Sequence, residues 1–136
     1  MFDKPDQVVR QAADAIWSLR AEDAFERWHT PGFQNHTAPP GTDSSLTLFK
    51  QAQTRFLDAF SDTRLDIFGQ VVEGDRVASL IRMCGTHSGV FMGAAPTGKT
   101  VEASGMRMDR VENGRIAEHW AVIDLLNLMR QISPAA

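Results

Sequence analysis

Hydrophobic residues in the first half of the chain recur at the spacing of helices. The apolar positions fall three and four residues apart, which places them on one helical face: Val8, Val9, Ala12, Ala13, Ile16 and Leu19. A second, shorter helix is expected over residues 22–28, where it would bury Phe25 and Trp28. Pro31 and Gly32 then interrupt the pattern, because neither residue type continues a helix well.

A third helix is expected after a loop over residues 33–42 that holds a short extended stretch. Asp43 or Ser44 would cap its N-terminus, since both residue types accept hydrogen bonds from the first free backbone N–H groups. Its apolar stripe consists of Leu48, Phe49, Ala52, Phe56, Ala59 and Phe60. The first half of the chain is therefore predicted to be helical, apart from this loop.

The hydrophobic period changes in the second half of the chain. Alternating positions predict strands over residues 64–72, 76–85, 99–111 and 115–123, separated by turns rich in glycine, asparagine and proline. Helices followed by an antiparallel meander indicate an α+β domain, with the helices on one face of a curved sheet. At 136 residues the chain is expected to form a single domain, residues 1–136.

The register of the last hairpin determines which side chains share a face. A two-residue turn at Asn113-Gly114 and a three-residue turn with Gly114 as a bulge differ by one residue in register. We favour the bulge, because it separates apolar from polar side chains. The apolar face then carries Met106, Met108, Trp120, Val122 and Asp124, and the polar face carries Arg107, Asp109 and His119. The apolar face is expected to line the interior.

Asp124 ends this apolar face and admits two interpretations. It follows the apolar segment 120–123 and precedes Leu125, where burial would raise the pKa of its carboxyl. A carboxyl tuned in this way suits proton transfer at a carbon acid. Asp is also a favoured N-cap, so the side chain could serve only to begin a helix at Leu125. Spacing alone leaves both interpretations open.

Composition and charge narrow the classes of function. Hydrophobic residues make up 43% and charged residues 23% of the chain, as in globular proteins. The net charge of −3 and the lack of a Lys/Arg cluster argue against nucleic-acid binding. The single cysteine, Cys84, excludes an internal disulfide, and no apolar run approaches the ~20 residues of a membrane span. The polar, acidic start MFDKPDQ is unlike a signal peptide, so we expect a cytoplasmic protein.

The histidines offer candidates for chemistry but no metal motif. The four of them, His29, His36, His87 and His119, lack the spacing of metal pairs, so a metal site is not expected. No nucleophile elbow, phosphate-binding glycine loop or dinucleotide fingerprint occurs in the sequence. His36 and His87 lie in segments rich in Gly, Pro and Thr, where polar residues often serve function. His29 is expected to be structural, and His119 to face solvent or a partner.

A set of short motifs, in order along the chain, resembles a known family. The motifs are Asn35-His36, Pro40-Gly41, Ala59-Phe60-Ser61-Asp62, Glu73-Gly74-Asp75-Arg76-Val77, Gly85-Thr86-His87-Ser88-Gly89, Pro96-Thr97-Gly98-Lys99 and His119-Trp120, closed by Asp124 and Gln131. Together they resemble the SnoaL-like polyketide cyclases, or ester cyclases, of the nuclear-transport-factor-like superfamily. The resemblance implies a cone-shaped α+β fold, in which a curved antiparallel sheet surrounds a pocket that N-terminal helices close.

The resemblance also implies an activity and the residues that carry it. Members of the family close a ring by intramolecular aldol condensation of an aromatic polyketide ester, without metal or cofactor. The general acid/base of the family lies at the position of Asp124, and its partner asparagine at that of Asn35. His36 and His87 match histidines that would line or gate the mouth of the pocket.

We therefore expect cofactor-independent acid/base catalysis on a small hydrophobic carbonyl compound. Asp124 would remove a proton next to the carbonyl group. Asn35, together with His87 or His36, would donate hydrogen bonds to the oxyanion. The side chains expected to bind substrate are Trp120, Met106, Met108, Val122, Phe33 and Phe91. The family has polar side chains where this chain has the two methionines, which indicates a more apolar ligand or a different reaction.

Other functions remain open on this scaffold. One is a different reaction, that of an isomerase, dehydratase, epoxide hydrolase or cofactor-free hydroxylase. Arg82 or Arg107 pointing into the pocket would favour an epoxide hydrolase, which pairs an acidic carboxyl with a water-positioning group. The other is a non-catalytic ligand-binding or dimerisation module, in which Asp124 bonds only to amides of its own helix. No nucleic-acid or membrane partner is expected, and a homodimer is expected through the sheet face away from the pocket.

Overall fold

The helices and strands follow the order that the sequence predicts. In the computed structural model, which describes residues 2–133, the helices are α1 (Pro5–Ala13), α2 (Ala24–Trp28), α3 (Leu46–Ala59) and α4 (Leu125–Ile132), and a π-helical turn, η1 (Asp14–Ser18), continues α1. The strands are β1 (His29–Asn35), β2 (Phe60–Glu73), β3 (Arg76–His87), β4 (Thr100–Glu112) and β5 (Arg115–Ile123). The α+β fold class is confirmed.

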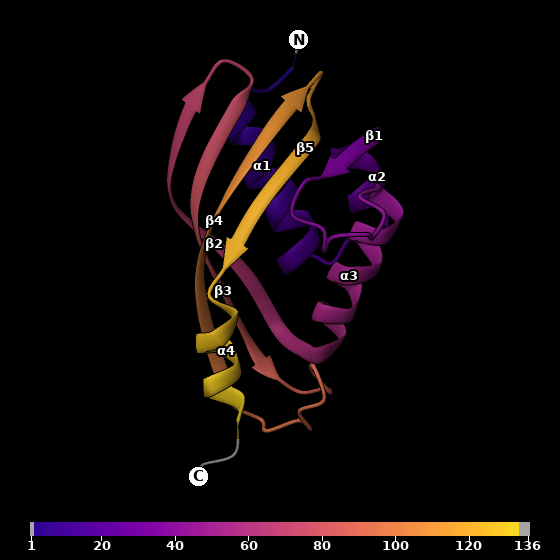
Figure 1. Ribbon diagram of the computed structural model, residues 1–136. Helices are drawn as coiled ribbons and strands as arrows, with labels where there is room; N and C mark the ends of the chain where they lie inside the picture. The colour runs from indigo at the N-terminus through magenta and orange to yellow at the C-terminus, as the bar shows by residue number, and fades with distance from the viewer. Residues whose placement is uncertain (1, 134–136) are drawn as a thin grey trace.

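The five strands form one sheet in the order β1-β5-β4-β3-β2. Strands β2 to β5 form the expected antiparallel meander, whereas β1 pairs with β5 in parallel. The sheet is therefore mixed and open, with β1 and β2 at its edges. Figure 1 shows the long curved strands beside α1, α2 and α3, with α4 packed at the end of the sheet opposite the β4–β5 turn.

Helix α1 begins at Pro5 and ends earlier than the apolar pattern up to Leu19 predicts. Pro5 occupies the first helical position, where a missing N–H costs nothing, and the backbone N–H of Lys4 donates to Gln7 Oε1 across 3.1 Å. Over Asp14–Ser18 the chain then forms the π-helical turn, which adds a residue and shifts the helical face. The expectation that Leu19 joins the core is wrong, since 69% of its surface is exposed.

Helix α3 begins one residue later than predicted. Ser45 is the N-cap. Its backbone N–H and its hydroxyl both donate to the carboxylate of Asp43 across 2.9 Å. Phe49 is buried on the predicted apolar stripe. Phe60, expected at the end of that stripe, is instead the first residue of β2 and is also buried.

The β4–β5 hairpin has the favoured pairing but a different turn. Asn113 and Gly114 both have positive φ, 50° and 79°, so the turn has two residues and is of type I′. The extra residue lies further along β5, because the register shifts between Arg110 and Val111. Placing the bulge at Gly114 is therefore wrong, although the strands pair in the favoured register beyond this shift.

The two faces of this hairpin are inverted relative to the prediction. Met106 and Val122 lie on the outer face of the sheet, with 55% and 73% of their surface exposed. Arg107, Asp109 and His119 share the opposite face and are buried. Burial of charged side chains is tolerated when they pair with one another, and these three do. The expectation that the apolar face lines the interior is wrong.

The core consists of two clusters of buried side chains. One lies between the N-terminal helices and the sheet and includes Val9 and Phe25. The other joins β3 and β4 to α4 and includes Met83 and Leu128. Trp17, from the π-helical turn, packs against both clusters. No helix within residues 2–133 is long and apolar enough to cross a membrane.

Candidate active site

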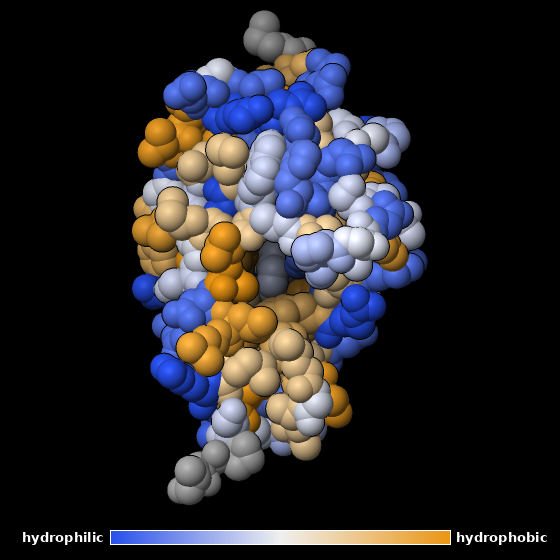
Figure 2. All heavy atoms as spheres, viewed as in Figure 1, coloured by the Kyte–Doolittle hydropathy of each residue, from blue (hydrophilic) through white to orange (hydrophobic). Residues whose placement is uncertain are grey.

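A cavity of about 200 Å³ lies between the inner face of the sheet and the N-terminal helices. Its apolar wall includes Ala12, Ile16, Trp17, Phe49, Phe56, Leu65 and Ile81. Its polar lining consists of His29, Gln53, Arg107 and His119. Figure 2 shows a hollow in the surface between the end of β5 and α3, the elements that contribute Ile123 and Gln53 to the lining. An apolar space with a few polar groups is the usual form of a small-molecule site.

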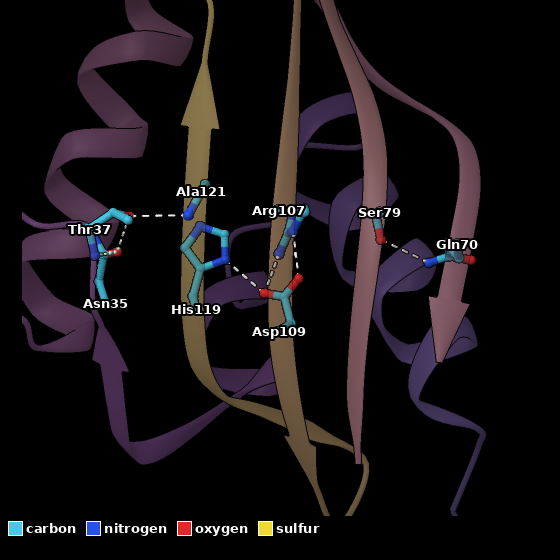
Figure 3. Close-up of polar contacts among 8 residues, drawn as sticks. All are labelled: Asn35, Thr37, Gln70, Ser79, Arg107, Asp109, His119 and Ala121. Atoms are coloured by element: carbon cyan, nitrogen blue, oxygen red, sulfur yellow. Dashed lines mark hydrogen bonds and ion pairs between the residues drawn. The ribbon is translucent and has the colours of Figure 1, made fainter. Parts of the chain in front are cut away.

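A hydrogen-bonded triad forms one wall of the cavity. Arg107 and Asp109 lie two residues apart on β4 and so share a face of the sheet. His119 lies opposite Asp109 on β5. His119 Nδ1 donates to Asp109 Oδ1 across 2.7 Å. Arg107 donates from Nε and Nη2 to the same carboxylate, across 2.7 and 2.9 Å. Figure 3 shows the three side chains converging, with the carboxylate between the imidazole and the guanidinium.

The charges of the triad fix its protonation. Burial would raise the pKa of Asp109, but the charge of Arg107 and the hydrogen bonds from its two partners outweigh it and hold that pKa well below its usual range. Burial and the charge of Arg107 lower the pKa of His119. One anion and one cation already compensate each other, so a protonated His119 would be a second buried cation without its own counter-charge. The triad therefore holds a carboxylate, a guanidinium and a neutral imidazole.

The neutral imidazole of His119 is held in one tautomer. An ionised carboxylate can only accept, so the proton lies on Nδ1 and the lone pair on Nε2. Among residues 2–133, only His87 Nε2 is both fully buried and without a partner. His119 Nε2 also has no partner there, so it reaches open space, and the space that His119 borders is the cavity. The cavity wall therefore presents a base.

A second histidine, His29, borders the same cavity from the start of β1. Its Nδ1 lies 2.8 Å from the carbonyl oxygen of Phe25, in the last turn before the strand. Burial lowers the pKa of His29 to about 4, so its ring is also neutral at pH 7. The expectation of a structural role therefore accounts for one ring nitrogen only.

A polar row lies beside the triad and begins on the neighbouring strand β3. Ser79, fully buried on β3, lies opposite Arg107. Its hydroxyl accepts a hydrogen bond from Gln70 Nε2 across 3.2 Å, and Gln70 Oε1 accepts from Arg10 Nε across 2.7 Å. Figure 3 shows Ser79 and Gln70 of this row beside the triad. No group of three or more His, Cys, Asp or Glu side chains that could hold a metal ion occurs within residues 2–133.

Comparison with known proteins identifies the family of this chain. A model of the SnoaL-like polyketide cyclases matches residues 7–132. The chain belongs to the SnoaL-like polyketide cyclase family. IdmH from Streptomyces antibioticus, a proposed polyketide cyclase, is 27% identical over 95% of this chain and 98% of its own, with a TM-score of 0.84.

Two further solved structures widen the comparison. A proposed polyketide cyclase from Acidithiobacillus ferrooxidans is 25% identical over 98% of this chain and 97% of its own, with a TM-score of 0.84. AclR from Streptomyces galilaeus, a proposed hydroxylase, is 25% identical over 94% of each chain, with a TM-score of 0.83. No curated protein matches the chain. These likenesses confirm the SnoaL-like fold that the ordered motifs imply.

Asp124 lies outside the cavity of this SnoaL-like chain. Its side chain is exposed and accepts a hydrogen bond from the backbone N–H of Asn127 across 3.0 Å, as the N-cap of α4. It does not line the cavity. The apolar residues around it belong to the end of β5 and the start of an amphipathic helix, which explains the sequence pattern without burial of the carboxyl.

Asn35 and His36 lie at the end of β1 and do not line the cavity. The side-chain oxygen of Asn35 accepts from the backbone N–H and hydroxyl of Thr37, and that hydroxyl accepts from the N–H of Ala121 across 3.3 Å (Figure 3). His36 Nε2 lies 2.8 Å from Glu118 Oε1. These two residues therefore hold the edge of β5 rather than the cavity wall.

His87 is fully buried at the end of β3, apart from the cavity lining. The N–H of Thr97 donates to its Nδ1 across 3.3 Å, so Nε2 carries the proton. The ring packs beside Phe60, with centroids 5.4 Å apart. Contrary to expectation, His87 does not lie at the mouth of this cavity, because its ring is fully buried beside Phe60.

None of the six side chains expected to bind substrate lines the cavity. Four of them lie on the outer face of the sheet: Trp120, Met106, Met108 and Val122. Phe33 is buried in the core, where its ring packs against His29 and Phe49. Phe91 packs against Phe56 and Phe60. The inverted hairpin faces account for the position of the first four side chains outside the cavity.

Sequence reasoning missed the triad, although one signal for it was present. Arg107 and Asp109 stand two residues apart on a strand, so they share a face, and the favoured register adds His119 to that face. An anion flanked by a cation and an imidazole is able to satisfy itself in a buried site. The expectation that His119 faces solvent is wrong for this reason, with only 6% of its surface exposed.

Proposed function

We propose that this SnoaL-like protein catalyses proton transfer at a carbon next to a carbonyl group, with His119 as the general base. The observation that carries the proposal is that His119, which lines the cavity, has no hydrogen-bond partner at Nε2 within residues 2–133, while Asp109 accepts from Nδ1 across 2.7 Å. Asp109 would keep accepting the hydrogen bond from Nδ1 while Nε2 takes the proton, and the enolate formed in the same step would supply the counter-charge of the imidazolium. Membership of a cyclase family supports an enzyme in general.

The proposed reaction is an intramolecular aldol cyclisation. His119 Nε2 removes a proton from the carbon next to one carbonyl, and the C–H electron pair becomes the enolate. The enolate carbon attacks a second carbonyl carbon of the same molecule, which forms the ring bond and leaves an alkoxide. The alkoxide takes the proton back from Nε2, so the base is regenerated. Every proton and electron pair in these reaction steps comes from the substrate or from His119.

Arg107 is suited to stabilise the enolate oxygen. Its Nε and Nη2 donate to Asp109, whereas Nη1 has no hydrogen-bond partner within residues 2–133. The guanidinium borders the cavity, so Nη1 is available to a carbonyl oxygen next to His119. A preorganised donor of this kind typically contributes about 10²–10³ to kcat. Base and oxyanion donor would thus come from one buried network.

Deuterium exchange tests the proton-transfer step without knowledge of the natural substrate. The probe is 2-tetralone, a two-ring ketone, incubated with the protein in D₂O while loss of the α-proton signals is followed by NMR. We expect wild-type protein to exceed the buffer rate and His119→Gln to lose about 10²–10⁴ of that acceleration. Asp124→Asn, which keeps a good N-cap, should retain it.

The same experiment has outcomes that overturn the proposal. Exchange that persists in folded His119→Gln would remove His119 as the base. Exchange lost in folded Asp124→Asn, with His119→Gln still active, would return the role to Asp124. Circular dichroism of each variant reports whether the fold is retained.

A second candidate, epoxide hydrolysis, is favoured by the inward position of Arg107. Arg82, the other arginine considered, instead lies 4.4 Å from the centroid of Phe68, and its Nε is 3.8 Å from a Glu102 carboxylate oxygen. In this reaction His119 takes a proton from water, the oxygen attacks an epoxide carbon, the C–O bond breaks, and the imidazolium protonates the alkoxide. Cyclohexene oxide in ¹⁸O-labelled water tests it. Labelled diol formed only when His119 is present would favour this reaction over cyclisation.

A further inference from the structure

His29 presents a second bare acceptor to the cavity, one that the proposed proton transfer does not use. Its Nδ1 lies 2.8 Å from the carbonyl oxygen of Phe25, which can only accept. The proton of the neutral ring therefore lies on Nδ1, and Nε2 carries the lone pair. The ring is fixed by aromatic neighbours, with centroids 4.9 Å from that of Phe33 and 5.5 Å from that of Phe49.

The Nε2 atom of His29 reaches the cavity. No hydrogen bond to it occurs within residues 2–133, and it is not among the fully buried atoms without a partner, a state that only His87 Nε2 has there. His29 as a whole is only 2% exposed, and the open space it borders is the cavity. A buried acceptor facing an apolar space is satisfied only when a ligand or a water molecule donates to it.

The cavity as a whole carries no net charge for a ligand to neutralise. Arg107 and Asp109 compensate each other, and both histidines that line the cavity are neutral. A carboxylate or phosphate would meet a guanidinium whose charge Asp109 already compensates. The volume of about 200 Å³ lies below the roughly 300–1,000 Å³ of pockets for drug-sized molecules. These features favour a small neutral ligand.

We propose that His29 selects the substrate by accepting a hydrogen bond from a hydroxyl group, so that the cavity takes a neutral hydroxy-carbonyl compound of one or two rings. The inference rests on the proposed function, since it places the donor of the substrate at His29 and the acidic carbon at His119. Arg107 donates a hydrogen bond to the carbonyl oxygen, and the apolar wall packs against the rings. A substrate without a hydroxyl leaves the acceptor of His29 unsatisfied.

Binding of three matched probes tests the role of His29. The probes are 1-naphthol, 1-methoxynaphthalene and naphthalene, which share the rings and differ in the hydroxyl donor, and binding is measured by ligand-observed NMR. We expect the wild-type protein to bind 1-naphthol about tenfold more tightly than 1-methoxynaphthalene, the factor that one buried hydrogen bond gives. His29→Leu should lose this preference, whereas His119→Gln should keep it.

A measurement on the unaltered protein covers the case in which His29→Leu does not fold. The ¹⁵N shift of His29 Nε2 should move on addition of 1-naphthol toward that of a hydrogen-bonded acceptor, and should not move on addition of naphthalene. No shift with 1-naphthol bound, or a naphthol preference unchanged in folded His29→Leu, overturns the inference.

The two proposals fail in different ways. Deuterium exchange that depends on His119, with a naphthol preference that ignores His29, would overturn the selection by His29 and leave the proton transfer standing. A naphthol preference that depends on His29, with exchange that ignores His119, would overturn the proton transfer and leave the binding role of His29 standing.

Discussion

The imidazole of His119 and the carboxylate of Asp109 meet across 2.7 Å from neighbouring strands, with Arg107 on the far side of the carboxylate. The pairing decides which nitrogen of His119 carries the proton and which faces the cavity. It also makes burial of the three side chains possible, because the carboxylate accepts one hydrogen bond from His119 and two from Arg107. Function and stability therefore depend on the same contacts.

Replacing Asp109 by Asn should harm both properties. The amide cannot compensate Arg107, and breaking a buried pair typically costs about 3–5 kcal/mol. It also no longer fixes the tautomer of His119, so α-proton exchange should fall with stability. Urea unfolding and the exchange assay measure the two effects. Glu118→Gln, which removes a carboxylate from a more exposed pair with Arg110, serves as the control and should change the unfolding free energy by no more than ~1 kcal/mol. Equal stability losses in the two variants would contradict the prediction.

The unfolding free energy should fall as the pH drops from about 6.5 to about 4. His29 has a folded pKa of about 4 against an ordinary value of 6.5, so in this window the unfolded chain binds the proton and the folded protein does not. The contribution of neutral His29 to the free energy of unfolding is thus present in full above pH 6.5. About 3 kcal/mol of this free energy is lost by pH 4. The lowered pKa of His119 acts in the same direction.

Histidine variants separate the contribution of His29. Urea unfolding at several pH values should give a flatter profile for His29→Gln than for wild type. His36→Gln, which alters an exposed histidine, is the control for replacing a histidine by Gln. A wild-type profile that is flat between pH 6.5 and 4 would contradict the lowered pKa values.

The sequence predicted the elements and the pairing of strands better than it predicted the inside of the molecule. The bounds of β5 and the register of Met108 with Trp120 follow from the hydrophobic alternation, which depends on local spacing. Which face of the hairpin is buried does not follow from this alternation. Apolar side chains take the interior by default, but polar side chains that pair with one another can be buried instead. Arg107 and Asp109 have partners across and along the strands, so the polar face is the buried one. Such mutual satisfaction depends on geometry in three dimensions.

Loss of the Asp124 side chain should weaken α4 and leave proton transfer intact. Asp124→Ala removes the hydrogen bond to the N–H of Asn127, and losing an N-cap typically costs about 0.5–2 kcal/mol. Asp124→Asn should be nearly neutral, since Asn caps equally well. Urea unfolding compares the two variants, with α-proton exchange measured alongside. Equal stability of the Ala and Asn variants would mean that the cap contributes nothing.

The expected homodimer stays a prediction, and the exposed sheet face makes it specific. Val122, Met106 and Leu80 lie opposite one another across β5, β4 and β3, and are 73%, 55% and 46% exposed. An apolar row matches a second copy of itself in a two-fold interface, whereas a row of like charges would not. Light scattering after size exclusion should give twice the chain mass of 15.1 kDa, and Met106→Glu should give the monomer. A monomeric wild type would contradict it.

Gly105 should be intolerant of a side chain, because β4 and β5 approach closely beside the cavity. A Cβ atom on Gly105 would lie 3.0 Å from the Cα of Ile123 and closer still to the carbonyl oxygen of Val122, both parts of the backbone. Gly105→Ala must therefore displace β5, at a typical overpacking cost of about 1–3 kcal/mol. Gly69→Ala on β2 is the control, since its Cβ meets nothing within 4 Å. Urea unfolding should separate the two variants. Equal unfolding free energies would mean that β5 shifts freely, and that the cavity wall formed by Ile123 is softer than the structure indicates.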